Sequence, residues 1–117
     1  MEVQAITKNV RMSAQKMREV VRQIQGLPAA RASAVLAVVP RKGARVVAKT
    51  LKSALANAED LKTHNPGYQD FKTDQLRVKL AVAGTATSIK RFIPKARGSA
   101  GPILKRNCHV KIVLTDE

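Results

Sequence analysis

The stretch from Gln75 to Thr115, QLRVKLAVAGTATSIKRFIPKARGSAGPILKRNCHVKIVLT, decides the fold of this chain. Its two ends alternate in hydrophobicity with a period of two, which predicts strands with one buried face. We expect the buried side chains to be Leu76, Val78, Leu80, Val82, Cys108, Val110, Ile112 and Leu114.

Between these strands, over Gly84 to Pro102, the alternation fades and glycine and proline punctuate the chain. A segment this long is unusual as a loose loop. The sequence therefore predicts that both strands continue outward as a long hairpin at about residues 84–103, turning near Lys95 to Ser99. Each arm is then ~30 Å long at ~3.3 Å per residue. A free hairpin of this kind is marginal in water, so we expect its order to depend on a partner.

The same stretch is uniformly basic. It contains no carboxylate and carries nine basic side chains: Arg77, Lys79, Lys90, Arg91, Lys95, Arg97, Lys105, Arg106 and Lys111. Like charges on a thin projection repel one another unless a polyanion neutralises them. A purely solvated lysine surface is the alternative, but solvated faces usually mix both signs. The pattern favours contact with phosphate.

Composition bounds the class of protein. The chain has 117 residues, with 22 Lys and Arg against 8 Asp and Glu and a net charge of +14. Its hydrophobic fraction of 44% is that of a folded protein, so we expect a single domain spanning 1–117. Aromatic residues make up only 3%, which argues against successive bases stacking on rings.

Several site classes find no support in the sequence. Cys108 is the only cysteine, so neither an intrachain disulfide nor a cysteine-rich zinc site is expected, and we predict a buried thiol. Neither Glu59/Asp60 nor Asp116/Glu117 suits a general acid/base pair, because adjacent side chains point apart. No glycine-rich phosphate loop occurs. We expect no catalysis, no cofactor, no metal and no small-molecule substrate.

The first 40 residues have the sequence pattern of one strand followed by two helices. The strand covers Val3 to Lys8, and Ser13 is a plausible N-cap for a helix that Gly26 ends. A second helix is expected over Ala29 to Val39, stopping before Pro40. One face of the first helix is apolar, through Met17, Val20, Val21 and Ile24. The first residues lack a secretory signal, and no apolar run could span a bilayer, so a soluble protein of a reducing compartment is expected.

A third helix has two opposite rows of side chains. The apolar row is Ala44, Val47, Leu51, Ala54, Ala58 and Leu61. The basic row, two residues earlier, is Lys42, Arg45, Lys49 and Lys52. An offset of two residues at ~100° each separates the rows by about 160°. One face should therefore pack on the core while the other binds an anionic surface or serves solubility alone.

Other cations and two aromatic side chains join the candidate interface. Lys16, Arg18 and Arg22 lie on the first helix, where the like-charge pair Arg18 and Arg22 is mildly destabilising unless an anion is near. His109 faces the basic side of its strand and either donates to phosphate or is simply exposed. Phe92 either contacts a base or ribose or packs across the hairpin, and we favour packing.

Four blocks occur in order along the chain: SAQKMR at 13–18, LKSALANAE at 51–59, KRFIPKARG at 90–98 and ILKRNCH at 103–109. Together they resemble the bacterial large-subunit ribosomal protein number twenty-two family over nearly the whole chain. The resemblance implies an α+β fold with three helices on a small three-stranded antiparallel sheet and a long protruding β-hairpin.

The resemblance also implies a function. Members of this family are structural constituents of the large ribosomal subunit in the cytoplasm, with the body on ribosomal RNA and the hairpin lining the polypeptide exit tunnel. The implied partners are large-subunit ribosomal RNA, neighbouring ribosomal proteins and the nascent polypeptide, with no membrane. Carried over by motif, the RNA-binding hairpin residues are Lys90, Arg91, Lys95, Arg97, Lys105 and Arg106. The implied tip is Lys95, Ala96, Arg97, Gly98, Ser99 and Ala100.

The chain departs from the family pattern at the tip. Relatives commonly have arginine at the position of Ser99 and charged residues around Gly101 and Pro102, so two RNA contacts would be missing or replaced. A rival interpretation is an architectural DNA-bending protein whose basic ribbon enters the minor groove with Pro94 as a wedge. That architecture generally needs a dimer, for which the sequence shows no seam.

Overall fold

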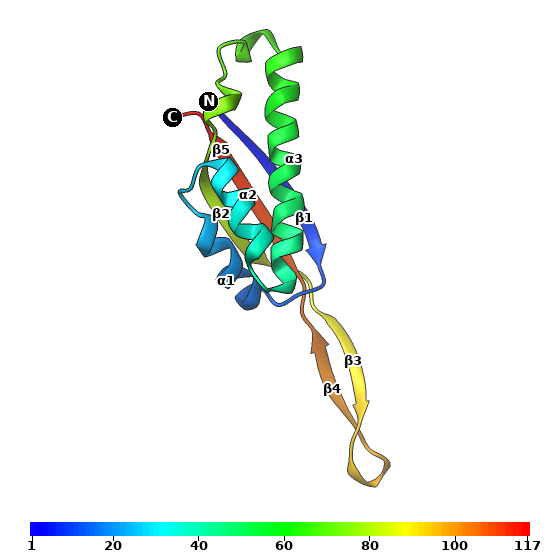
Figure 1. Cartoon of the computed structure of the whole chain (residues 1–117). Coiled ribbons are helices and arrows are strands. Elements are labelled where there is room, and N and C mark those ends of the chain that lie inside the picture. The colour runs from blue at the N-terminus through cyan, green and yellow to red at the C-terminus, as the bar shows by residue number, and fades with distance from the viewer.

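The computed structural model describes all residues, 1–117, as a helix-covered sheet from which a narrow ribbon projects (Figure 1). The sheet strands are β1 (Glu2–Val10), β2 (Arg77–Thr85) and β5 (Cys108–Thr115). The helices are α1 (Ala14–Ile24), α2 (Ala29–Val38) and α3 (Lys42–His64). The ribbon strands are β3 (Ile89–Pro94) and β4 (Ala100–Lys105).

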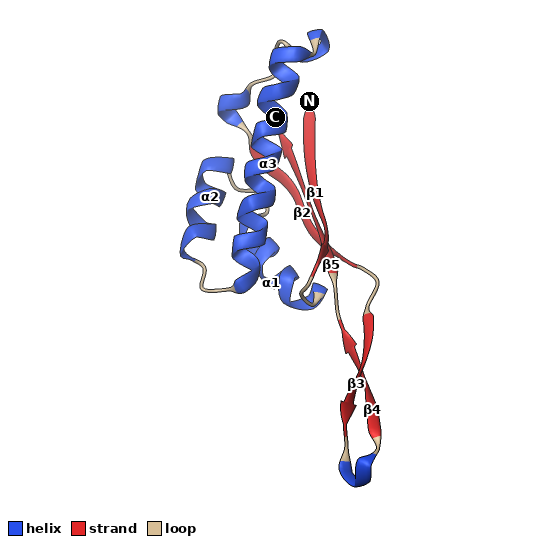
Figure 2. Cartoon of the chain, turned by 90° about the vertical axis from the view of Figure 1, so that its right-hand side faces the viewer, coloured by secondary structure: helices blue, strands red, loops and turns tan.

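The three-stranded sheet has the order β1-β5-β2, with β5 antiparallel to both neighbours. All three helices lie on one face of it, and the other face is open (Figure 2). The β3–β4 ribbon forms a separate antiparallel sheet that extends the molecule to 67 × 28 × 16 Å. The predicted α+β class, with three helices on a three-stranded sheet and a protruding hairpin, is confirmed.

The hydrophobic core lies between the sheet and the helices. It is one cluster of 24 buried residues, in which Met17, Leu51, Phe71, Ile112 and Leu114 are fully buried. The predicted apolar face of α1 is buried throughout, and that of α3 is buried up to Ala58. Periodicity therefore identified the core face of both helices correctly.

The end of α1 is fixed by the edge of β2. Gly26 has a φ of 83°, the left-handed conformation expected after the last helical turn. Its amide donates to the Val78 carbonyl at 2.9 Å, and the Val78 amide donates to the Leu27 carbonyl at 2.9 Å. The start of α1 differs from the prediction in one respect, because Ser13 occupies the N-cap position without a side-chain capping hydrogen bond.

The predicted inward phase of β2 is wrong beyond Val78. A β-bulge lies at Lys79, where Val78 pairs with Leu114 but Leu80 pairs with Val113. The extra residue exchanges the two faces of the strand. Ala81 is therefore 2% exposed and Val82 39% exposed, whereas plain alternation predicted that Val82 points inward.

The strands do not continue unbroken into the ribbon, contrary to the sequence-based expectation. Pairing of β2 with β5 ends at Thr85 and Cys108, and the ribbon ladder begins at Ile89 opposite Lys105. The turn lies where it was predicted, since the Lys95 amide donates to the Ser99 carbonyl at 2.7 Å. Arg97 and Gly98 both have positive φ there, which is what reverses the chain.

The two phenylalanines give a stability prediction. Phe71 is fully buried, whereas Phe92 on the ribbon is 77% exposed. Phe71→Ala should lower the free energy of unfolding by about 3–5 kcal/mol through the cavity it leaves. Phe92→Ala, the matched control, should change it by less than about 0.5 kcal/mol. Urea denaturation followed by circular dichroism measures both, and equal losses would mean that the ribbon belongs to the cooperative core.

The bulge gives a second stability prediction. Ala81→Glu places a carboxylate in the core and should lower the free energy of unfolding by more than about 3 kcal/mol. Val82→Glu places one on the open face opposite Lys111 and should lower it by less than about 1 kcal/mol. The same denaturation measurement separates the two variants. The reverse ranking would show that β2 keeps plain alternation past Lys79.

Candidate nucleic-acid interface

The basic row of α3 faces solvent along its whole length. Lys42, Arg45, Lys49 and Lys52 are all exposed, and none of them forms an ion pair or a side-chain hydrogen bond within the chain. Their neighbours Ala44, Val47, Leu51 and Ala54 hold the opposite face of the helix in the core. The helix therefore presents four free cations from a rigid support.

The cations of α1 are exposed but not equally free. The side chain of Arg18 donates through Nε to the Ala83 carbonyl at 3.1 Å, so part of its guanidinium anchors α1 on β2. Lys16 and Arg22 are exposed and have no acidic partner. Glu19, the one carboxylate of α1, pairs with Arg41 at 3.4 Å between Oε2 and Nη1. The arrangement leaves positive charge in excess on this surface.

The ribbon offers its cations no internal partner. Every residue from 89 to 100 is exposed, as are Lys105 and Arg106. The only side-chain hydrogen bond made by a ribbon cation runs from Arg91 Nη1 to the Lys90 carbonyl at 2.8 Å. Because no carboxylate lies on the ribbon, the charges of Lys90, Arg91, Lys95 and Arg97 stay unneutralised.

Phe92 does not take the packing role that we favoured. It lies opposite Pro102 in the ribbon ladder, yet 77% of it remains exposed. A two-stranded ribbon has no second layer, so a large side chain on it cannot be enclosed. The ring is therefore available to a partner.

The tip, from Lys95 to Ala100, is a compact exposed turn. The Ser99 hydroxyl donates to the Ala96 carbonyl at 2.8 Å, so the residue that departs from the family pattern closes the turn. The Lys95 side chain lies across the backbone at Gly101, where a Cβ in place of the glycine hydrogen would approach Cε to 2.7 Å. A side chain at position 101 would have to displace that lysine.

His109 has a role that the sequence did not reveal. Its Nδ1 accepts a hydrogen bond from the Asn9 amide at 3.0 Å, where β1 bulges and Asn9 has a φ of 56°. The ring thus joins β5 to β1, and only Nε2 is left to meet a phosphate. The sequence analysis considered His109 only as a phosphate donor or as an exposed side chain, and neither alternative included this contact.

Sequence reasoning also missed Arg11 and Arg41. Both are exposed, both lie in connections between elements, and neither belongs to a periodic row. Arg11 Nη1 donates to the Arg106 carbonyl at 2.9 Å, which ties the body to the base of the ribbon. Their only sequence signal was a basic residue in the short connection before a helix, next to the first helical residue for Arg41 and three residues ahead of it for Arg11.

The carboxylates gather at the far end of the molecule. Of the eight acidic residues, all but Glu19 lie near the chain termini, the C-terminal end of α3 or the connection that follows it: Glu2, Glu59, Asp60, Asp70, Asp74, Asp116 and Glu117. Figure 1 shows that this end lies opposite the ribbon. The negative charge of the molecule is therefore concentrated at the end opposite the ribbon.

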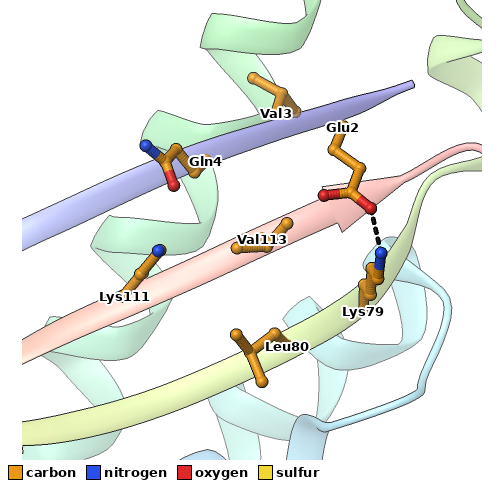
Figure 3. A pocket seen from close by; sticks show the side chains of 7 residues that line it. All are labelled: Glu2, Val3, Gln4, Lys79, Leu80, Lys111 and Val113. Atoms are coloured by element: carbon orange, nitrogen blue, oxygen red, sulfur yellow. Dashed lines mark hydrogen bonds and ion pairs between the residues drawn. The ribbon is translucent and has the colours of Figure 1, made fainter.

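The open face of the sheet carries a shallow pocket across β1, β5 and β2 (Figure 3). Its single carboxylate, Glu2, is engaged by Lys79, and this hydrogen bond raises the pKa of the lysine. Cys108 lies in the core as predicted, where burial raises the pKa of its thiol. No group of three or more His, Cys, Asp or Glu side chains is placed to hold a metal.

No helix of the chain combines the length and apolarity needed to cross a membrane.

Comparison with known proteins assigns the chain to a family. Residues 5–115 match the model of the family described as ribosomal protein L22p/L17e. The chain is similar to the large ribosomal subunit protein uL22 of Opitutus terrae, with 50% identity over 116 residues that cover 99% of this chain and 96% of that protein. The proteins of the same name from Akkermansia muciniphila and Chloroflexus aggregans are 43% and 44% identical over 117 residues, covering 98% and 97% of their lengths. The chain therefore belongs to the ribosomal protein L22p/L17e family.

Proposed function

We propose that this protein is a structural constituent of the large ribosomal subunit that binds ribosomal RNA through its cationic helix faces and ribbon. The observation that carries the proposal is the ribbon, whose cations are all exposed and have no carboxylate partner. Family membership and the names of the relatives support it. The protein acts in the ribosome by holding RNA in place, with no catalytic step.

The physical basis of binding is counterion release. Each Lys or Arg that neutralises a phosphate frees condensed cations from the RNA, so affinity falls steeply with salt. Arg91, Arg97 and Arg106 can grip phosphates with two parallel hydrogen bonds, while the lysines act as point charges. Double-helical RNA is recognised mainly by shape and by its ribose hydroxyls, which suits a surface with few aromatic rings.

The shape of the ribbon suits a narrow crevice. Folded ribosomal RNA presents junctions too tight for a globular body, and a two-stranded ladder is only two chains wide. We assign the ribbon to the wall of the peptide exit tunnel, with the tip from Lys95 to Ala100 beside the nascent polypeptide. Neighbouring ribosomal proteins then contact the remaining surface of the body.

Removing the basic row of α3 tests the RNA contact. The quadruple variant Lys42→Ala, Arg45→Ala, Lys49→Ala and Lys52→Ala should remain folded, because all four side chains are exposed. If each contacts one phosphate, the slope of log K against log salt should fall by about 3, at ~0.7–0.9 per phosphate. Fluorescence anisotropy with large-subunit ribosomal RNA at several salt concentrations measures the slope.

The matched control removes four other exposed cations, Arg31, Lys62, Lys72 and Arg77. It loses the same formal charge but should keep most of the slope. Equal slopes in both variants would mean that only net charge matters and that the α3 row is not a binding face. Duplex DNA that competes as well as ribosomal RNA would favour the DNA-bending alternative.

Shortening the ribbon tests the tunnel assignment. Lys90, Arg91 and Phe92 pair with Leu104, Ile103 and Pro102, so deleting both triplets shortens the two arms equally and keeps the remaining register. The tip should retract by about 10 Å, at ~3.3 Å per residue. The shortened protein should still sediment with large subunits in high salt. A photo-cross-linker at position 97 should then lose most of its product with a stalled nascent chain.

The control for this experiment is a cross-linker at the exposed Thr63, at the opposite end of the molecule, which should give no nascent-chain product in either protein. Cross-linking from position 97 that persists unchanged after the deletion would place the tip elsewhere than the tunnel wall. Failure of the shortened protein to fold would show that the ribbon supports the body.

A further inference from the structure

A pocket lies where the ribbon leaves the body, and we call it the neck pocket. It has a volume of about 450 Å³ and brings together three separate parts of the chain: the β1–α1 connection with the first turn of α1, the start of α3, and the end of β4 with the residue after it. Its lining includes Arg11, Lys16, Arg41, Lys42, Arg106 and the ribbon residue Leu104.

Five of the residues that line the neck pocket are cations, and none is a carboxylate. Only Arg41 has an acidic partner, Glu19, in an exposed and therefore weak ion pair. Lys16, Lys42 and the Arg106 guanidinium make no hydrogen bond within the chain, and all three are exposed. Five like charges around one hollow repel one another unless an anion occupies it.

The backbone around the neck pocket adds to this preference. The pocket includes Ser13 and Arg41, the N-cap residues of α1 and α3, and neither makes a side-chain capping hydrogen bond. Neither helix carries an acidic residue in its first turn. Amide groups at a helix start favour negative charge, so they reinforce the attraction that the side chains create.

The neck itself is held by few contacts. The Ala86 amide donates to the Asn107 carbonyl at 3.1 Å, and Asn107 Nδ2 donates to the Thr87 carbonyl at 3.0 Å. The third contact is the one from Arg11 to the Arg106 carbonyl at 2.9 Å. The ladder is interrupted here, between Thr85 and Ile89. The direction of the ribbon therefore depends on a short two-chain connection with little packing around it.

The geometry points to the neck pocket as a binding site for one RNA backbone phosphate, which bridges body and ribbon and so sets the direction of the ribbon. This inference rests on the proposed binding of ribosomal RNA. It locates one phosphate contact in the neck pocket and gives that contact the effect of fixing the ribbon direction. The phosphate oxygens accept hydrogen bonds from Lys16 and Lys42 on the body and from Arg106 at the ribbon base. Because these donors come from both sides of the neck, an occupied pocket restrains its bending.

The first test locates the anion with pyrophosphate as the probe. Backbone and arginine Nε–H signals of the folded chain are followed by NMR during the titration. The signals of the pocket residues should shift together, namely those of Ser13, Lys16, Arg41 and Arg106. Their shifts should saturate at a pyrophosphate concentration at least fivefold lower than the shifts of Arg91 and Arg97 on the ribbon. Parallel shifts at all arginines would show nonspecific attraction and overturn the site.

The second test measures the ribbon direction. Spin labels are attached at the exposed positions Ser33→Cys on α2 and Ala96→Cys at the tip. Cys108 does not compete for the label, because it is fully buried. Double electron–electron resonance should give a distance distribution that narrows at least twofold when pyrophosphate saturates the pocket. An unchanged width, or one already narrow without the probe, would overturn the proposal.

Matched variants separate the pocket from general charge. Lys16→Gln with Arg106→Gln removes two pocket cations but leaves the Arg106 carbonyl, and hence its bond to Arg11, in place. In this variant pyrophosphate should no longer narrow the distance distribution. Lys49→Gln with Arg45→Gln removes the same charge from α3. In this variant pyrophosphate should narrow the distance distribution as much as in the parent. Narrowing in both variants, or in neither, would overturn the assignment to the neck pocket.

Binding of large-subunit ribosomal RNA is measured separately on the same labelled parent. If the parent binds that RNA but shows no localised response to pyrophosphate, the neck site fails while the proposed function stands. If the pocket responds to pyrophosphate but the parent does not bind ribosomal RNA, the proposed function fails and the pocket is a phosphate site without that partner.

Discussion

The pairing of β5 with both β1 and β2 is the interaction on which the rest of the structure depends. It joins the two ends of the chain in one sheet, and its inward face, from Cys108 to Leu114, supplies the floor of the core. Helices cover only that face, so the core cluster of 24 buried residues lies on one side of the sheet (Figure 2). The ribbon inserted between β2 and β5 receives no such cover.

This one-sided burial divides the molecule into a part that is stable by packing and a part that is shaped for contact. The body has a fully buried Phe71 and Leu51, whereas the ribbon exposes Phe92 and all its cations. A two-stranded sheet without a second layer gains little from burial. Its positive charges further favour a partner of opposite sign, which supports the RNA-binding role that we propose for the ribbon.

Charge is arranged along the long axis as well as between faces. All acidic residues but Glu19 gather around the two termini, the end of α3 and the connection that follows it, whereas the ribbon carries cations and no carboxylate. A charge distribution of this kind would turn the ribbon toward the polyanionic RNA that we propose as the partner. The neck pocket is lined by cations of the body and by Arg106 at the base of the ribbon, so both parts would attract an anion there.

The sequence by itself determined what depends on local periodicity. The apolar faces of α1 and α3, the left-handed Gly26, the turn at Lys95 to Ser99 and the absence of carboxylates from Gln75 to Thr115 could all be read from it. Only the tertiary structure decided what depends on pairing between distant segments. The bulge at Lys79 reverses the buried phase of β2, because register is set by the partner strand β5 and not by alternation within β2. The contact of His109 with Asn9 and the gathering of Arg11, Arg41 and Arg106 at the neck join residues far apart in the chain, and no local pattern could have shown them.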